Sequence, residues 1–135
     1  MLKDSMQRTD LDRIKRLIIN KSWWDSVDSL ANIIGILCAK YPELVQNHIL
    51  SWAESENIWL VRISVLFQLK YKENTDRELL KLIILKNTNN KEFFITKAFG
   101  WALREYSMTN KEWVKLFLES NTLQSLSVRE ASKYL

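Results

Sequence analysis

The stretch Lys21-Ser-Trp-Trp-Asp-Ser-Val-Asp28 opens a segment whose pattern returns twice further along the chain. A shift of 35 residues aligns two columns: Trp24, Trp59 and Phe94 in one, and Val27, Arg62 and Lys97 in the other. The helix starts at Thr75 and Thr109, which lie between these segments, are 34 residues apart. Long and short helices that alternate at this period are typical of an α-solenoid of the HEAT or armadillo kind. Because few aligned residues are identical, an irregular helical bundle with coincidental spacing is the alternative.

Four helix starts carry a capping box, in which Ser or Thr is followed three residues later by an acid that helps to satisfy the free N–H groups of the first turn. The pairs are Ser22 with Asp25, Thr75 with Glu78, Thr109 with Glu112, and Ser127 with Glu130, and Pro42 marks a fifth start. Together with the apolar spacing, they predict helices at residues 8–19, 22–39, 42–54, 57–71, 75–86, 91–106, 109–119 and 127–134.

Composition supports the same fold class. The chain has 135 residues, enough for one domain, and its 2 Gly and 1 Pro are too few for the many tight turns of a β-sandwich or barrel. We therefore expect an all-α fold, a right-handed α-solenoid of antiparallel helix pairs that forms a single domain over residues 1–135.

Several function classes are disfavoured by composition. A single cysteine, Cys38, excludes an internal disulfide and a cysteine cluster for zinc, and His48 has no second ligand at metal-binding spacing, so no metal site is expected. The longest apolar stretch, residues 30–39, is too short to span a bilayer, and no secretory leader is recognisable, so we expect a cytoplasmic protein. The net charge of +4 is compatible with a polyanionic partner but is common in proteins that have none.

Asp28 is the first candidate functional residue. Unlike Asp25, it has no capping role, and it follows Trp24 by four residues, so a carboxylate and an indole share one helix face. An acid in this position is either a solvated surface charge or a site residue. The two neighbouring indoles favour a site.

Two cations and a ring form a second constellation. Lys97, Trp101 and Arg104 lie at i, i+4 and i+7 of the predicted helix 91–106, as expected for phosphate contacts beside a ring that packs on a sugar or base. An ordinary amphipathic helix is the simpler interpretation of this helix alone.

Arg62 emerges from an otherwise apolar helix face and therefore requires a partner, either an acid or a ligand phosphate. The 35-residue shift puts it one repeat beyond Val27 and hence beside Asp28. We expect the two side chains to lie close together.

Three runs in this order resemble the AlkD-type DNA alkylation repair proteins, a HEAT-like family of alkylpurine DNA glycosylases. The runs are residues 22–28 (SWWDSVD), residues 59–62 followed by 67–72 (WLVR and FQLKYK), and residues 97–106 (KAFGWALREY), and the ending at residues 126–131 is also similar. The resemblance covers nearly the whole chain.

The resemblance implies a solenoid whose concave face grips duplex DNA and an activity that hydrolyses the N-glycosidic bond of cationic N3- and N7-alkylated purines. It implies that Asp28 is the catalytic carboxylate, that Trp24 and Trp101 form a cleft around the deoxyribose of the lesion, and that Arg62 contacts the DNA backbone. Lys97 and Arg104 are further backbone-binding candidates. The family requires no metal or organic cofactor, and a bacterial member would be associated with the nucleoid.

Family members carry additional helical repeats ahead of the Ser-Trp-Trp-Asp motif, which here begins at Ser22. Without those repeats, we expect lower DNA affinity and an exposed apolar repeat face that favours self-association. Two alternatives to a glycosylase therefore stay open. One is a DNA-binding repeat domain without turnover, and the other is a protein-interaction scaffold, the commonest use of helical repeats.

Overall fold

A computed structural model describes residues 7–21 and 24–135, without the side chains of residues 21–26. Throughout this described part the chain forms helices and connecting turns, and no strand occurs in it. The elements in chain order are α2 (Asp10–Lys21), α3 (Trp24–Lys40), the π-helical segment η1 (Val45–Ile49) continued by α4 (Leu50–Trp52), α5 (Ile58–Leu66), η2 (Lys72–Asn74), α6 (Arg77–Lys86), α7 (Phe93–Ser107), α8 (Lys111–Ser120), α9 (Ser125–Ala131) and η3 (Ser132–Tyr134). These bounds confirm the predicted all-α fold class.

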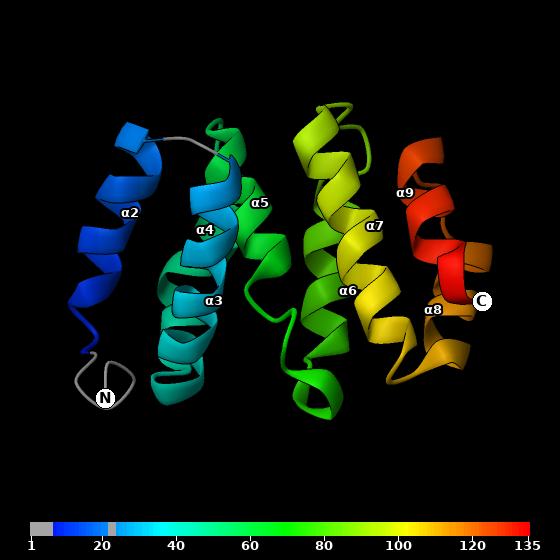
Figure 1. Cartoon of the computed structure of the whole chain (residues 1–135), viewed down its shortest axis with the longest axis horizontal. Coiled ribbons are helices and arrows are strands. Elements are labelled where there is room, and N and C mark those ends of the chain that lie inside the picture. The colour runs from blue at the N-terminus through cyan, green and yellow to red at the C-terminus, as the bar shows by residue number, and fades with distance from the viewer. Residues whose placement is uncertain (1–6, 22–23) are drawn as a thin grey trace.

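The helices form two rows along the long axis of the molecule (Figure 1). In the row nearer the viewer, α3 packs on α5, α5 on α7, and α7 on α9. Helices α4, α6 and α8 return behind this row, so that each helix pair is antiparallel (Figure 1). The arrangement is that of an α-solenoid, in which each unit contacts its neighbours along one axis.

Side-chain hydrogen bonds repeat the period seen in the sequence. Many of those between helices join residues 31–36 positions apart: Arg8 to Glu43, Tyr71 to Gly35, Lys86 to Glu54, Asn87 to Ala53, Gln124 to Thr88, and Ser127 to Thr96. Such contacts connect equivalent positions of successive helix pairs. They support the solenoid over the irregular bundle, whereas its right-handed sense stays a prediction.

Two helix caps differ from the prediction by one residue. Asp76, not Thr75, caps α6 and accepts a hydrogen bond from the N–H of Leu79 at 3.0 Å. Asn110, not Thr109, caps α8 in the same way. Aspartate and asparagine are at least as good as threonine at this position, so the sequence offers two adjacent caps at each start.

The last predicted cap is wrong for a different reason. Helix α9 begins at Ser125, and Ser127 lies inside it with its hydroxyl donating to the carbonyl oxygen of Thr96 at 2.6 Å. Ser127 is buried and joins α9 to α7 instead of capping a helix. The predicted box of Ser22 and Asp25 lies outside the described side chains.

Helix α5 is shorter than the predicted segment 57–71, because it ends at Leu66. The side chain of Gln68 then turns to α6, where its amide donates to the carbonyl oxygen of Asp76 and its own oxygen accepts from the N–H of Asp76. These two bonds satisfy the buried side chain of Gln68 and join the turn to the start of α6.

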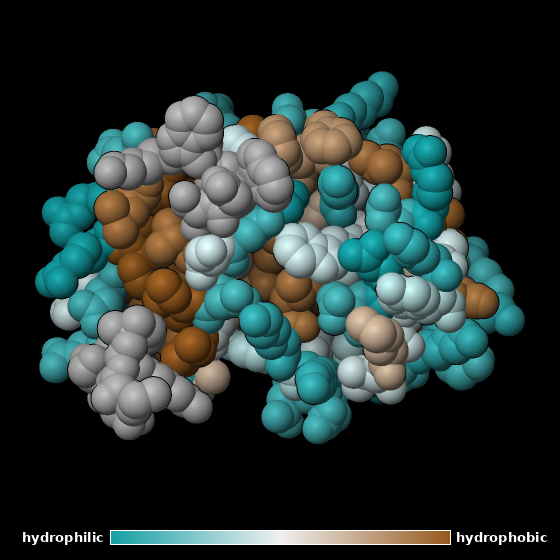
Figure 2. Space-filling view, in the orientation of Figure 1, coloured by the Kyte–Doolittle hydropathy of each residue, from teal (hydrophilic) through white to brown (hydrophobic). Residues whose placement is uncertain are grey.

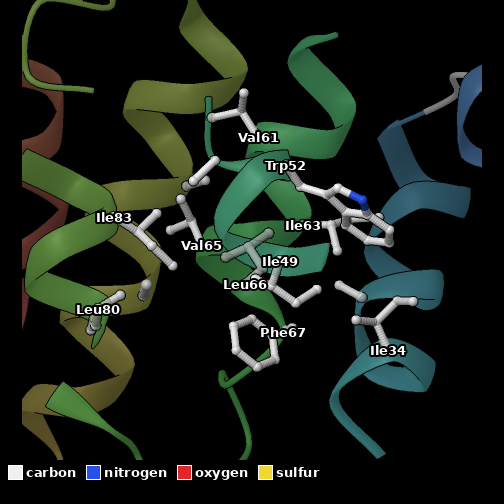
Figure 3. Packing of buried hydrophobic residues seen from close by; sticks show 14 of the residues in the cluster. Ile34, Ile49, Trp52, Val61, Ile63, Val65, Leu66, Phe67, Leu80 and Ile83 are labelled. Atoms are coloured by element: carbon white, nitrogen blue, oxygen red, sulfur yellow. The ribbon is translucent and has the colours of Figure 1, made fainter. Parts of the chain in front are cut away.

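The core runs the length of the solenoid, with α5 at its centre. All residues of α5 from Leu60 to Leu66 are buried. Trp52 is 2% exposed and lies among Ile34, Ile49 and Ile63 (Figure 3). Because α5 is recessed between α3 and α7, it forms the floor of the surface between them.

Apolar side chains gather over α2 and α3 in the view of Figure 2, whereas polar ones dominate over α7 and α9. Leu17 and Ile19 of α2 are each 45% exposed. Self-association through this face stays a prediction. Among the described residues, no helix is long and apolar enough to cross a membrane.

Candidate functional site

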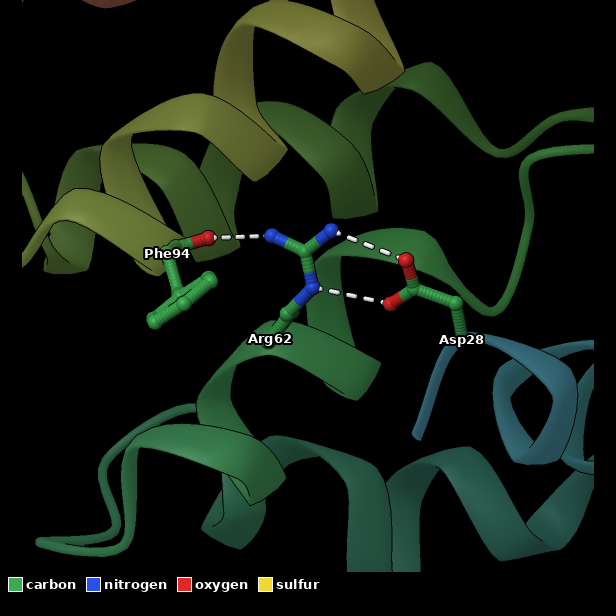
Figure 4. Close-up of polar contacts among 3 residues, drawn as sticks. All are labelled: Asp28, Arg62 and Phe94. Carbon is green, nitrogen blue, oxygen red and sulfur yellow. Dashed lines mark hydrogen bonds and ion pairs between the residues drawn. The ribbon is translucent and has the colours of Figure 1, made fainter. Parts of the chain in front are cut away.

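Asp28 and Arg62 meet on the floor of the surface between α3 and α7 (Figure 4). Asp28 is one turn into α3, and Arg62 is one turn into α5. The Nε of Arg62 donates to Oδ1 of Asp28 at 2.8 Å, and a terminal nitrogen donates to Oδ2 at 3.0 Å. The predicted proximity is confirmed, and the partner of Arg62 in this structure is the acid.

Arg62 is enclosed on its remaining sides. Its other terminal nitrogen donates to the carbonyl oxygen of Phe94 at 2.5 Å, and its guanidinium carbon lies 5.8 Å from the centre of the Trp101 ring. The side chain is only 4% exposed. Three of its five N–H groups are therefore used within the protein, and both Asp28 oxygens are held in one orientation.

An open groove of about 600 Å³ lies above this ion pair. Its lining includes five of the six predicted site residues: Asp28, Arg62, Lys97, Trp101 and Arg104. Thus α3, α5 and α7 bring the acid, the ring and the cations to one surface. Trp24, the sixth, begins α3, but its side chain lies outside the described residues, so its role in the cleft stays a prediction.

Phe93, Phe94, Glu130 and Lys133 also line the groove, and the sequence analysis did not identify them as site residues. The column shared with Trp24 and Trp59 contains Phe94 and could have indicated it. Glu130 and Lys133 had no local signal, because α9 and η3 reach the groove only by packing on α7.

The cations of the groove differ in their partners. Arg104 donates to Oε2 of Glu130 at 3.1 Å, and this pair is partly exposed, with side-chain exposures of 22% and 29%. Lys97 is exposed, and its ammonium lies 5.5 Å from the centre of the Phe93 ring. Arg104 is thus partly neutralised, whereas Lys97 is available to an anion.

Other reactive groups lie away from the groove. Cys38 is 3% exposed, and burial raises the pKa of its thiol to about 12, so it stays protonated and is not a nucleophile at neutral pH. Within the described part of the chain, no three His, Cys, Asp or Glu side chains come together as they would to hold a metal ion.

Comparison with known proteins identifies the family. The sequence model of a family described as "DNA alkylation repair enzyme" matches residues 1–135. The chain belongs to this family. The AlkD-type resemblance, drawn from three motifs, is thereby confirmed at the level of the family.

A solved structure with a similar description has the same fold. It is described as "Predicted DNA alkylation repair enzyme from Enterococcus faecalis", and it is 35% identical to this chain with a TM-score of 0.90. The match covers 98% of this chain and 62% of the other chain. The present chain therefore spans less than two thirds of the length of that relative. No curated protein matches the sequence.

Proposed function

We propose that this DNA alkylation repair family member is an alkylpurine DNA glycosylase, which hydrolyses the N-glycosidic bond of cationic N3- and N7-alkylated purines in duplex DNA. The observation that carries the proposal is the orientation of Asp28. Two hydrogen bonds from Arg62 hold its carboxylate in one orientation. The groove that Asp28 lines is also lined by an indole and several cations.

The reaction requires help at the sugar. An alkylated purine already carries a positive charge and leaves readily, so protonation of the base is unnecessary. As the glycosidic bond breaks, the deoxyribose becomes oxocarbenium-like. A fixed carboxylate stabilises such a cation better than a mobile one, because no reorganisation is needed during the reaction.

Asp28 keeps acceptor capacity for this task. A carboxylate has about four lone-pair sites, and Arg62 uses two of them. The side chain is 17% exposed, so a free site is available to orient the attacking water. Arg62 thus acts as a positioning residue for Asp28, and we propose this role instead of the DNA-backbone contact expected from the resemblance.

The remaining groove residues fit a DNA strand beside the acid. The face of Trp101 attracts positive charge and can pack on the deoxyribose, together with Trp24 as the resemblance implies. Lys97 and Arg104 are the proposed contacts to phosphates next to the lesion. As the resemblance implies, the duplex is held against this surface and the damaged base is not extruded into a cavity.

The first experiment is the release of 7-methylguanine and 3-methyladenine from methylated duplex DNA by the purified chain, with Asp28→Asn beside it. We expect release by the wild type, none by the variant, and similar DNA affinity for both. Because Asp28→Asn removes one half of an ion pair, its folding is checked by circular dichroism. Trp101→Ala provides a second variant that leaves the pair in place and is also expected to lower release.

The two other candidate functions predict different results. DNA binding without turnover predicts salt-dependent affinity for duplex DNA but no release by the wild type. A protein-interaction scaffold predicts neither. Equal release by the wild type and a folded Asp28→Asn would contradict the role of the carboxylate.

A further inference from the structure

A second cation, Lys70, shares a groove with Asp28 and Trp101, and Lys97 does not line this groove. Asp28 and Trp101 line not only the groove described above but also a smaller one of about 250 Å³. Lys70 lines this smaller groove, together with residues of α3 and the end of α5. The acid and the indole therefore stand between two hollows, each of which has a lysine in its wall.

Lys70 is carried by a turn that is unusually well fixed. The turn follows α5, and Lys70 is the only exposed side chain of residues 67–71. Gln68, which precedes it by two residues, is 3% exposed and makes two hydrogen bonds to the backbone of Asp76. The hydroxyl of Tyr71, which follows it, donates to the carbonyl oxygen of Gly35 in α3.

Gly35 explains how close this turn lies to α3. A Cβ at Gly35 would be 2.3 Å from the carbonyl oxygen of Phe67, so only glycine allows the turn to approach α3 this closely. The backbone of Lys70 is thus held from both sides, by α6 through Gln68 and by α3 through Gly35. A fixed backbone lowers the entropic cost of directing a long lysine side chain toward a ligand.

The charge of Lys70 is available. Within the described part of the chain, no carboxylate lies within ion-pairing distance of its ammonium, in contrast to Arg104 and Lys86, which are paired with acids. Glu73 and Glu105 line another hollow with Lys70 but form no ion pair with it. A lysine ammonium is a compact charge on a flexible stem and binds phosphate well in this setting.

We propose that Lys70 binds a DNA phosphate on the opposite side of the Asp28–Trp101 pair from the phosphate bound by Lys97. This proposal rests on the proposed function, because it takes duplex DNA as the partner. A duplex presents two rows of phosphates that flank a groove, and cations on both sides of a central acid and ring match such a ligand. Asp28 itself repels phosphates, which directs them to the two sides.

The test measures DNA affinity over a range of salt concentrations for the wild type, Lys70→Ala and Lys115→Ala. Lys115 is also an exposed lysine and belongs to α8, which lies in the rear row. It lines none of the grooves named above, so it controls for the loss of one positive charge. Loss of one phosphate contact lowers the slope of log affinity against log salt by about 0.9, which corresponds to about eightfold weaker binding at 0.1 M salt. We expect this change for Lys70→Ala only.

Single methylphosphonate substitutions then locate the contact. We expect one neutralised phosphate to weaken the wild type but not Lys70→Ala, and a different one to behave in this way for Lys97→Ala. Two results would overturn the proposal and leave the proposed function intact. One is an equal salt slope for Lys70→Ala and Lys115→Ala, and the other is a single phosphate that accounts for both Lys70 and Lys97. Absence of salt-dependent binding by the wild type would overturn both.

The specificity of the contact is tested with a single strand and with polyglutamate. The two-sided arrangement predicts that Lys70→Ala weakens binding to the duplex more than to either of these ligands. Equal weakening for all three would indicate a general anion site and would contradict the assignment to duplex DNA.

Discussion

The carboxylate of Asp28 lies against the guanidinium of Arg62 with both oxygens hydrogen-bonded, although the two residues are 34 positions apart. They belong to successive units of the solenoid, so the orientation of one groove residue depends on the packing of two helices. The pair is largely shielded from water, with side-chain exposures of 17% and 4%. Its geometry therefore matters more than it would at an exposed surface.

Arg62→Lys should distinguish the positioning of the Asp28 carboxylate from the effect of the positive charge at residue 62. Lysine keeps the positive charge but lacks the planar fork that holds both oxygens. We expect a loss of about 1–3 kcal/mol in the free energy of unfolding, together with slower base release and an unchanged salt slope of DNA binding. Urea unfolding, single-turnover kinetics and anisotropy titrations measure these quantities. Arg129→Lys, the same exchange at an exposed residue of α9, is the control. Base release by Arg62→Lys at the wild-type rate would contradict the positioning role of Arg62.

Gly100→Ala should loosen α9 from α7. A Cβ at Gly100 would lie 2.6 Å from the Cβ of Glu130 and 3.0 Å from the carbonyl oxygen of Ser127. Although alanine favours a helix by about 1 kcal/mol over glycine, we expect a net loss of stability, because overpacking costs about 1–3 kcal/mol and Glu130 is pushed away from Arg104. Thermal denaturation measures the loss. Ser120→Ala, at the exposed end of α8, should change the melting temperature little, and an unchanged value for Gly100→Ala would contradict the close packing.

Trp52 allows a prediction about an unpaired indole. Its Nε1 is buried and has no hydrogen-bond partner among the described residues. Trp52→Phe should therefore cost about 1 kcal/mol, since no hydrogen bond is lost, whereas Trp52→Ala leaves a cavity and should cost about 3–5 kcal/mol. Urea unfolding of the two variants measures the difference. A loss for Trp52→Phe as large as that expected for Trp52→Ala would contradict an indole N–H without a partner.

The free energy of unfolding should decrease at alkaline pH because the thiol of Cys38 is buried. Burial raises the pKa of its thiol from 9.0 to about 12, so between these values the unfolded chain releases a proton that the folded chain keeps. The free energy of unfolding then decreases as pH rises, by up to about 1.4 kcal/mol per pH unit from this group. Burial also raises the pKa of Tyr71, which adds the same trend.

Cys38→Ala removes the thiol contribution, together with the smaller effect of the Cys38 charge on the pKa of Tyr71, whereas the lysines are common to both proteins. Urea unfolding between pH 8 and pH 11 should give a steeper decline for the wild type than for the variant. Parallel declines would mean that the thiol titrates normally in the folded protein.

The helical repeat could be predicted from local pattern because each unit places similar side chains on similar faces. The 35-residue shift therefore predicted that Arg62 lies beside Asp28, a contact between distant parts of the sequence. The helix boundaries were less predictable. At the starts of α6 and α8 two adjacent residues can serve as caps, and the structure uses Asp76 and Asn110.

The candidate site was predictable only in part. Asp28, Lys97, Trp101 and Arg104 stand out by type and spacing on their own helices. Glu130, Lys133 and Lys70 do not, because a single charged residue on a short helix or turn resembles any solvated residue. They reach the grooves because α9 packs on α7 and the turn after α5 packs on α3.

The sequence by itself determined the helical class, the period of the repeat, the family and the residue types of the groove. These properties depend on residue preferences that act over one or two helical turns, or on sequence motifs that can be compared directly. The tertiary structure alone decided where α5 stops, that Glu130 pairs with Arg104 and that Lys70 shares a groove with Asp28. Those outcomes depend on close contacts between helices about 30 residues apart, such as those at Gly35 and Gly100, where a single methyl group would change the packing.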